Sequence, residues 1–186
     1  MIEPGFKPGE INLNYPSANQ KSIFAPGGGQ MAKSKKSAYI AKSPVETKKL
    51  GFLLAKAVLE SGKRRRALVF TLAGELGAGK TNFIQGFAAG LGIEGTVNSP
   101  TFVILKKYPL ENLKNIKTFY HIDCYRLGSE SDLAQLGVEK ILADPANVVA
   151  IEWPEIAKNV LPRDALSINF EVFGNDSRRI VFDSQS

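Results

Sequence analysis

The sequence predicts an α/β fold of three layers, with a mixed, partly parallel sheet and a C-terminal antiparallel hairpin. Three observations support this prediction. A short apolar run, "RALVFTLA", ends at a glycine-rich loop that leads into a helix-like segment. Helical and strand-like patterns then alternate along the chain, which favours helices packed on a partly parallel sheet. Two alternating segments near the C-terminus are joined by "GNDS", as is typical of a hairpin.

The ordered part of the chain is expected to begin with a helix. Ser43 can cap this helix, Pro44 suits its first turn, and Glu46 completes a capping box. Leucine and small apolar residues then recur at helical spacing until the "SG" pair at 61–62. We therefore expect one long amphipathic helix before the first strand.

The remaining elements follow from the same periodicities and from the turn residues between them. Short apolar runs bounded by turns predict buried strands, and longer segments with helical spacing predict helices. We expect strands at 66–73, 101–108, 117–127 and 147–153, helices at 80–91 and 129–144, and hairpin strands at 165–174 and 178–184.

The N-terminal segment differs in composition from the rest of the chain. Residues 1–42 are rich in Pro, Gly, Ser, Asn and Lys and show no sustained periodicity. Such a segment buries too little apolar surface to offset the entropy lost on ordering. It also carries most of the net charge of +6, so the remainder is nearly balanced. We expect a disordered basic N-terminal extension over 1–42 and one folded domain over 43–186.

The composition also excludes several classes of protein. No run of about 18 apolar residues is present, so no membrane span is expected. The first residues lack the charged start, apolar stretch and cleavage site of a signal peptide. The single cysteine, Cys124, cannot form an internal disulfide. These features together predict a cytoplasmic protein.

The glycine-rich loop "GELGAGKT", residues 74–81, matches the phosphate-binding pattern G-x-x-x-x-G-K-[ST]. Its glycines allow the backbone to approach phosphate oxygens, and the helix that follows adds the positive end of its dipole. Lys80 is placed to reach the outer phosphates, and Thr81 offers a hydroxyl to Mg²⁺. Backbone amides are expected to cradle the phosphates from Leu76, Gly77, Ala78, Gly79, Lys80 and Thr81.

Two acidic residues are candidates to complete this site. Glu152 ends the apolar strand "VVAIEW", and carboxyl ends of parallel strands face the ligand crevice. The alternative is an ordinary solvated glutamate at a strand end. Asp123 lies in "HIDCYRL" among apolar neighbours, where a buried carboxylate is costly without a partner. It either orients a water molecule for hydrolysis or pairs with Arg126 for structural reasons.

Two further residues near these acids carry weaker signals. His121 alternates with Asp123, so both side chains are expected on one face of the strand. We interpret this histidine as structural. Trp153 either covers the site or packs against its neighbours, and the sequence leaves both options open.

Five motifs in this order resemble the TsaE (YjeE) family over residues 43–173: "GELGAGKT", "NSPTF", "HIDCYRL", "LGVEKIL" and "IEWPE". The resemblance implies a P-loop NTPase-like fold and a small bacterial ATPase that uses ATP and Mg²⁺. It implies a part in threonylcarbamoyl transfer to adenosine 37 of tRNA. The implied partners are TsaB and TsaD, with tRNA reached only through their complex. The implied ATPase is weak alone and supports turnover of that complex.

The resemblance also implies roles for individual residues. Lys80 and Thr81 would hold phosphate and Mg²⁺, and Glu152 would be the second metal ligand. Asp123 would be needed for hydrolysis, which makes Lys80, Asp123 and Glu152 the catalytic set. Thr47 would approach the nucleotide base, and Trp153 would lie beside the site. The segment "SPT" at 99–101 would act as a switch.

Four other functions remain alternatives. A small-molecule P-loop kinase needs an arginine-bearing lid, for which Arg126 and Arg163 are the only candidates. A GTP switch usually carries an N-K-x-D stretch, which is absent. A nucleotide-binding module without catalysis would not need Asp123. Direct nucleic-acid binding would use the N-terminal extension and the basic cluster at 63–66, and it would weaken steeply with salt.

Overall fold

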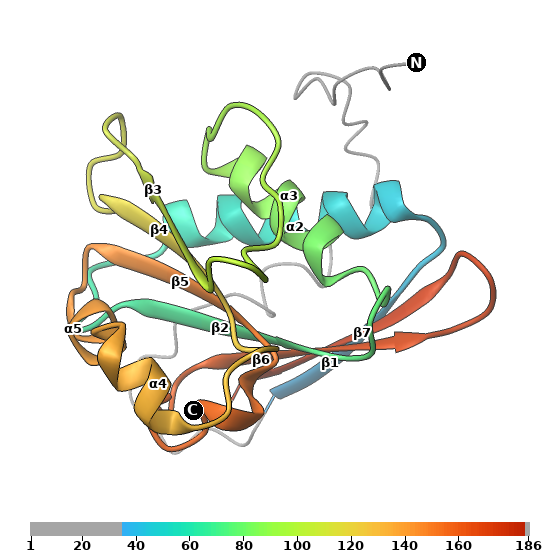
Figure 1. Cartoon of the computed structure of the whole chain (residues 1–186). Coiled ribbons are helices and arrows are strands. Elements are labelled where there is room, and N and C mark those ends of the chain that lie inside the picture. The colour runs from blue at the N-terminus through green and yellow to red at the C-terminus, as the bar shows by residue number, and fades with distance from the viewer. Residues whose placement is uncertain (1–34, 185–186) are drawn as a thin grey trace.

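A seven-stranded sheet organises the part of the chain that the computed structural model describes, residues 35–184 (Figure 1). Across the sheet, the strands are β1 (Lys35–Ala41), β7 (Arg178–Ser184), β6 (Leu166–Val172), β2 (Leu68–Ala73), β5 (Asn147–Glu152), β4 (Thr118–Asp123) and β3 (Leu105–Pro109). The helices are α2 (Pro44–Glu60), α3 (Lys80–Gly90), α4 (Glu130–Gln135), α5 (Val138–Ala143) and a 3₁₀ turn, Pro154–Ile156. Within this part of the chain, no helix is both long and apolar enough to span a membrane.

The centre of the sheet is parallel and its margins are antiparallel. Strands β6, β2, β5 and β4 run in one direction, whereas β3 and the pair β7 and β1 add antiparallel edges. Every residue of β5 is buried, as expected for a strand with helices on both faces. The carboxyl ends of β2, β4 and β5 therefore meet at one edge of the sheet, where ligands bind in α/β proteins.

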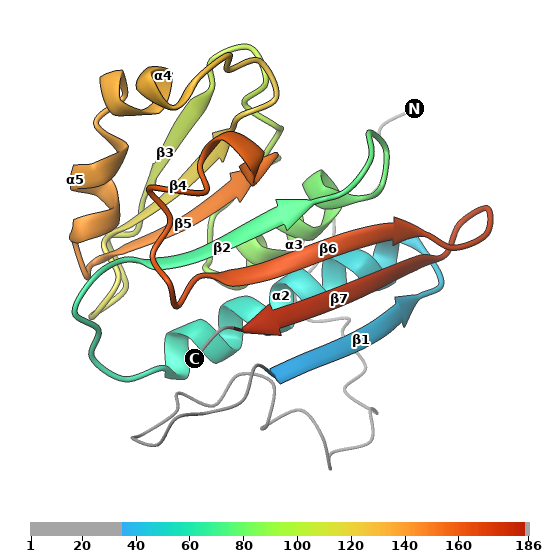
Figure 2. The same cartoon turned by 90° about the horizontal axis from the view of Figure 1, so that it is seen from below.

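The helices form layers on both faces of the sheet (Figure 2). Phe70 of β2 packs against Phe83 and Phe87 of α3, in the core that α2 and α3 form with the sheet. Val69 faces the other way and belongs to a second core that includes Leu133 of α4. The predicted three-layer α/β fold with a partly parallel sheet and a C-terminal hairpin is confirmed.

Helices α2 and α3 cross at unusually close range because glycines lie at their contact. A methyl group added at Gly86 would overlap the backbone carbonyl of Lys48, and one added at Gly51 would overlap the carbonyl of Phe83. Only glycine fits such an approach of two backbones. This contact fixes α3 against the sheet, and with it the helix N-terminus that carries Lys80 and Thr81.

The expectation of disorder is wrong for the last residues of the N-terminal extension. Lys35–Ala41 forms the edge strand β1, which pairs along its whole length with β7, from Lys35 opposite Ser184 to Ala41 opposite Arg178. Lysine-rich sequences are typical of edge strands, which use charge to discourage further pairing. Composition alone does not separate this case from disorder. The expectation for residues 1–34 lies outside the described residues.

Three predicted elements differ from the structure by more than two residues or in number. The strand expected at 101–108 begins only at Leu105, because residues 101–104 form a turn in which Ile104 has a φ of 64°. The strand expected at 117–127 ends at Asp123, where the chain turns. The helix expected at 129–144 is two helices, because Gly137 adopts a left-handed conformation between them.

The start of α2 follows the prediction closely. Ser43 Oγ accepts a hydrogen bond from the Glu46 amide at 3.2 Å, and Pro44 occupies the first turn. The Glu46 carboxylate accepts from the Lys42 amide at 2.8 Å, one residue before the expected partner. The cap therefore links the end of β1 to the beginning of α2.

Candidate functional site

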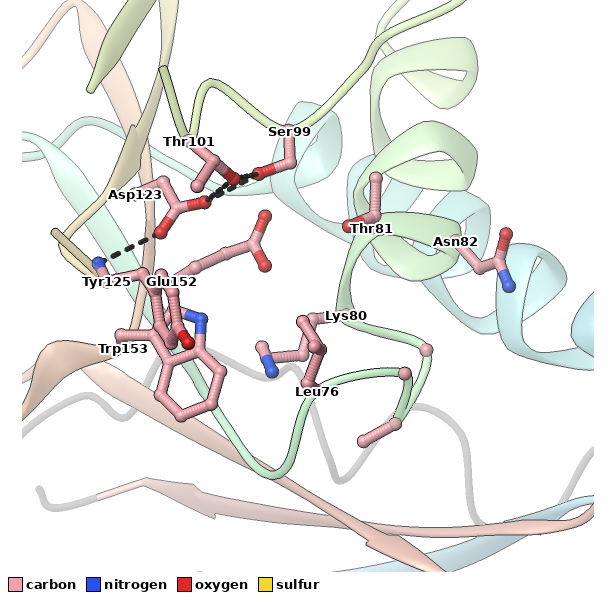
Figure 3. A pocket seen from close by; sticks show the side chains of 13 residues that line it. Leu76, Lys80, Thr81, Asn82, Ser99, Thr101, Asp123, Tyr125, Glu152 and Trp153 are labelled. Atoms are coloured by element: carbon pink, nitrogen blue, oxygen red, sulfur yellow. Dashed lines mark hydrogen bonds between the residues drawn. The ribbon is translucent and has the colours of Figure 1, made fainter. Parts of the chain in front are cut away.

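A cavity of about 260 Å³ opens where β2, β4 and β5 end (Figure 3). Its walls come from the loop after β2, the first turn of α3, the segment around residue 100 and the ends of β4 and β5. The residues that line it are Leu76, Gly77, Ala78, Gly79, Lys80, Thr81, Asn82, Ser99, Thr101, Asp123, Tyr125, Glu152 and Trp153. Most of the residues predicted for the site are therefore brought together.

The glycine-rich loop turns sharply between β2 and α3. Gly74, Gly77 and Gly79 all have positive φ angles, of 138°, 77° and 100°. Helix α3 begins directly after Gly79 and has no side-chain cap, so its first amides remain available to an anion. The Ala78 amide donates to the Glu75 carbonyl at 3.1 Å, so this amide stabilises the loop itself. The loop thus presents the end of a helix dipole to the cavity.

Lys80 is almost fully buried at the base of the cavity, with 5% of its surface exposed. Its ammonium group donates to the carbonyls of Gly74 at 2.6 Å and Glu75 at 2.9 Å. Burial lowers the pKa of Lys80, and the negative charges of Glu152 and Asp123 partly oppose that effect. A phosphate group would give this ammonium a charged partner that the loop carbonyls do not supply.

Asp123 ends β4 and has three hydrogen-bond donors around its carboxylate. Ser99 Oγ and Thr101 Oγ1 each donate to Oδ2 at 2.6 Å, and the Tyr125 amide donates to Oδ1 at 3.0 Å. These bonds offset the cost of burying a carboxylate that is 2% exposed. They also tie the predicted switch segment to the end of β4.

The alternative partner for Asp123, Arg126, lies elsewhere. Its guanidinium group sits 4.2 Å from the centroid of the Phe102 ring. Phe102 itself is 82% exposed, and neither residue lines the cavity. The pairing of Asp123 with Arg126 is therefore not what the structure shows.

Glu152 ends β5 directly opposite Asp123 in the parallel ladder. It is 3% exposed, so the alternative of a solvated glutamate at a strand end is wrong. Its Oε1 lies 2.8 Å from Nε2 of His121, which is completely buried. Figure 3 shows the Glu152 carboxylate pointing into the cavity toward Thr81. A carboxylate and a hydroxyl from adjoining elements thus face the same space.

The strand register explains why these side chains converge. Phe119 of β4 belongs to the core beneath α3, and side chains two residues apart share a face of the sheet. His121 and Asp123 therefore face α3 as well. Ala150 of β5 lies in the same core, which places Glu152 on that face. Each acid is the last residue of its strand, so it reaches beyond the core to the loop.

Trp153 adopts a left-handed backbone conformation with a φ of 56°. A non-glycine residue rarely adopts this conformation, and such strain concentrates at functional sites. The Trp153 amide donates to the Leu72 carbonyl at 3.2 Å, which continues the pairing of β5 with β2. Its ring lies 5.1 Å from that of Tyr125, and Lys80 Nζ is 4.0 Å from the indole centroid. Trp153 therefore forms one wall of the cavity.

Thr47 is the predicted site residue that does not line the cavity. It is buried in the first turn of α2, and its hydroxyl donates to the Ser43 carbonyl at 3.3 Å. A methyl group added at Gly79 would lie 3.6 Å from Thr47 Cγ2. Thr47 thus packs behind the loop, and its contact with a nucleotide base stays a prediction.

Sequence reasoning assigned no role to three residues at or beside the site. Tyr125 packs against Trp153. The only feature of the sequence that could have marked Tyr125 as a site residue is its position two residues after Asp123. Asn82 lines the cavity beside Thr81. Arg178 of β7 donates a hydrogen bond to the Gly77 carbonyl at 3.3 Å. The two residues are 101 positions apart in the sequence, so no local pattern indicates this contact.

The donor set fits a hydrated cation shared with a phosphate ligand. Within residues 35–184, no group of three or more His, Cys, Asp and Glu side chains is arranged to hold a metal. Mg²⁺ typically takes only one or two carboxylates and keeps phosphate and water ligands, so it does not need such a group. The Thr81 hydroxyl and the Glu152 carboxylate are the groups that would hold it here.

The loop, the helix behind it and the buried acids at adjacent strand ends define the class of protein as P-loop NTPase-like. The chain belongs to the TsaE family. The family model described as "Threonylcarbamoyl adenosine biosynthesis protein TsaE" matches residues 41–180. The resemblance predicted from the five motifs is therefore confirmed.

Individual relatives agree with the family model. The chain is 42% identical over 114 residues to the tRNA threonylcarbamoyladenosine biosynthesis protein TsaE of Borreliella burgdorferi, covering 61% of this chain and 78% of that protein. It is 40% identical over 140 residues to the protein of the same name from Bacillus subtilis, covering 75% and 80%. The crystal structure of Bacillus subtilis YdiB matches with a TM-score of 0.64 at 32% identity, covering 83% of this chain and 89% of that one.

Proposed function

We propose that this chain is the ATP-binding and ATP-hydrolysing component of tRNA threonylcarbamoyladenosine synthesis, where it supports repeated turnover by a TsaB–TsaD complex. One observation carries the proposal. A chain of the TsaE family brings a phosphate-binding loop, Lys80 and Thr81 into one cavity with two buried carboxylates, Asp123 and Glu152. A protein that only bound nucleotide would have no need to bury the second carboxylate.

Each side chain has a task in this proposal. Lys80 and the amides at the start of α3 bind the β- and γ-phosphates. Thr81 and Glu152 hold Mg²⁺, which neutralises phosphate charge when it is bound. Asp123 Oδ1 accepts one bond from Tyr125 and retains a lone pair with which to orient an attacking water. Trp153 and Tyr125 limit access of bulk water to this side of the cavity.

The metal site is tested by comparing Thr81→Ala with Thr81→Ser. The serine variant keeps the hydroxyl, so we expect ATP affinity to rise on adding Mg²⁺ as it does in the wild type. The alanine variant loses the ligand, so Mg²⁺ should add little affinity. Calorimetric titration of ATP with Mg²⁺ and with EDTA measures both. An alanine variant with the full Mg²⁺ effect would contradict the assignment of Thr81.

Hydrolysis, rather than transfer to a metabolite, is favoured by the positions of the two candidate lid arginines. Arg126 lies over the ring of Phe102. Arg163 lines a groove together with Arg65 and Arg66. These two arginines come just before β2, whereas the glycine-rich loop follows β2, so the groove lies at the opposite end of that strand. Neither Arg126 nor Arg163 covers the cavity. We expect phosphate release from ATP to water without an acceptor, slow for the protein alone, and preferred over release from GTP. A strong preference for GTP, or release that requires a metabolite, would overturn this proposal.

Partner binding is supported by exposed apolar side chains in the cavity lining and in the segment next to it. Leu76, Phe102, Val103 and Tyr125 are between 55% and 82% exposed and surround the loop and the segment around residue 100. Such a patch is typical of a protein interaction site. The proposed occupant is the TsaB–TsaD complex in the cytoplasm, with tRNA contacted through it.

The contact is tested by Phe102→Ser, measured as binding to TsaB–TsaD in the presence of ATP. The matched control is Ile40→Ser on the edge strand β1, which removes an exposed apolar side chain away from the cavity. We expect weaker binding only for the Phe102 variant. If the two variants bind TsaB–TsaD equally well, Phe102 is not part of the contact with this complex.

A further inference from the structure

The histidine next to Glu152 is enclosed on all sides. His121 has 0% of its surface exposed, and its ring stacks on Phe119 with an interplanar angle of 18°. Its Nε2 lies 2.8 Å from Oε1 of Glu152. Its Nδ1 is buried and has no hydrogen-bond partner within residues 35–184. One ring nitrogen is thus committed to the carboxylate and the other faces apolar surroundings.

This asymmetry fixes where the ring proton lies. A carboxylate only accepts hydrogen bonds, so the nitrogen beside it must carry the proton. A second proton on Nδ1 would leave a buried N–H without an acceptor, which is costly. The geometry therefore assigns the tautomer with the proton on Nε2, donated to Glu152.

We infer that His121 is a positioning residue that holds Glu152 by Oε1 and leaves Oε2 for a divalent cation in the cavity. The inference rests on the proposed function, because it names the residue that prepares the proposed metal ligand. The Glu152 carboxylate makes no other hydrogen bond within the described residues, so His121 alone sets its orientation. Hydrogen bonds to ligating carboxylates orient metal ligands in this way.

A purely structural role explains the pair less well. Burying an imidazole and a carboxylate costs more free energy than filling the same space with apolar side chains, which often stabilise a protein as much or more. The neighbouring core residues, Phe119 and Ala150, are apolar. Glu152 ends β5 and lines the cavity, and His121 lies two residues before the end of β4. Its position is therefore accounted for by the need to orient Glu152.

The first test changes the donor and measures metal-dependent binding. In His121→Gln the side-chain amide nitrogen can reach the position of Nε2, whereas in His121→Asn it can reach only that of Nδ1. His121→Phe keeps a ring against Phe119 and removes the donor. Each full-length variant is titrated with a non-hydrolysable ATP analogue, in Mg²⁺ and in EDTA.

We expect affinity in EDTA to be unchanged in all three variants. The gain in affinity on adding Mg²⁺ should fall roughly 10- to 100-fold in the Phe and Asn variants and be largely retained in the Gln variant. A Phe variant with the full gain would overturn the role of His121 while leaving the proposed function intact. A wild type that gains nothing from Mg²⁺ would refute the proposed function, and the positioning role with it.

The second test needs no variant, and it holds even if His121→Phe fails to fold. The chain has a single histidine, so ¹⁵N spectra of the full-length protein without a histidine tag contain the signals of one imidazole only. We expect one protonated nitrogen, assigned to Nε2, and one bare nitrogen, assigned to Nδ1. A proton found on Nδ1 with Nε2 bare would overturn the inference.

Discussion

The ammonium group of Lys80 lies 4.0 Å from the centroid of the Trp153 ring. These residues are distant in sequence, and the register of β2 with β5 brings them together. Leu72 pairs with Glu152 in this ladder, so the chain leaves both strands at the same edge of the sheet. A cation over an indole ring at a partly dry site contributes about 1–2 kcal/mol. The contact links the lysine of the glycine-rich loop to the wall of the cavity.

This contact makes Trp153 a reporter of ligand binding. The chain contains one tryptophan, so its fluorescence comes from this ring alone. A bound phosphate competes for the Lys80 ammonium, and we expect the emission to change in intensity when ATP and Mg²⁺ are added. Lys80→Met removes the cation, so this variant should start from a different emission and respond little. Unchanged wild-type emission at saturating ATP would contradict the proposed arrangement.

Asp123→Asn tests the proposed hydrolytic role of the carboxylate at the end of β4. The asparagine amide is a far weaker base than the aspartate carboxylate. Its nitrogen accepts no hydrogen bond, so it cannot replace the oxygen to which Ser99 and Thr101 both donate. We expect ATP binding to persist and turnover to fall by roughly 100-fold or more. Turnover is followed by phosphate release, and binding by calorimetry.

A control separates this chemistry from loop order. Ser99→Ala combined with Thr101→Val removes both hydroxyl donors to Asp123 Oδ2 but leaves the carboxylate in place. If Asp123 orients water, the double variant should keep more turnover than Asp123→Asn. Equal losses would reduce Asp123 to an anchor for the segment around residue 100.

Cys124 gives a prediction about pH. Burial raises the pKa of this thiol to about 12, and the nearby Asp123 and Glu155 carboxylates add to the effect. Below pH 9, the ordinary value, the thiol is protonated in both folded and unfolded chains. Between pH 9 and about 12 only the unfolded chain releases the proton, so the free energy of unfolding falls as pH rises.

Two measurements check this prediction. Denaturant unfolding above pH 9 should show a steeper loss of stability for the wild type than for Cys124→Ala, which lacks the titrating group. Iodoacetamide at pH 8 should modify the folded protein far more slowly than the unfolded chain, because the thiolate is the reactive form. Rapid alkylation of the folded protein would show that the thiol is neither buried nor protonated as described.

Gly86→Ala tests the close crossing of α2 and α3. The added methyl group would overlap the Lys48 carbonyl, so we expect a loss of roughly 1–3 kcal/mol in the free energy of unfolding. Gly62→Ala is the matched control, because nothing lies within 4 Å of the added group. Its effect should stay within about 0.5 kcal/mol, as for most surface changes. Thermal unfolding of both variants measures the difference.

The residues predicted at the cavity were those marked by a local pattern. The glycine-rich loop is contiguous in sequence, and Asp123 and Glu152 were marked as acids within or at the ends of apolar strands. Parallel strands then bring such ends together, which a sequence pattern can anticipate.

The features that were missed depend on long-range pairing. Lys35–Ala41 has a composition that also suits disorder. It forms a strand because it pairs with β7, which lies far along the chain. The contact of His121 with Glu152 depends on the diagonal offset between β4 and β5. Thr47 packs behind the loop against Gly79 and does not line the cavity. Each of these arrangements is set by packing between elements, which residue types alone do not specify.

The central claim is that ATP hydrolysis by this chain supports turnover of a partner complex that modifies tRNA. The most direct measurement combines the full-length protein with TsaB, TsaD and tRNA, and follows phosphate release and threonylcarbamoyladenosine over repeated turnovers. We predict that both rise when the chain is added, and that Lys80→Ala abolishes both effects. If neither phosphate release nor modified tRNA increases, the claim is contradicted.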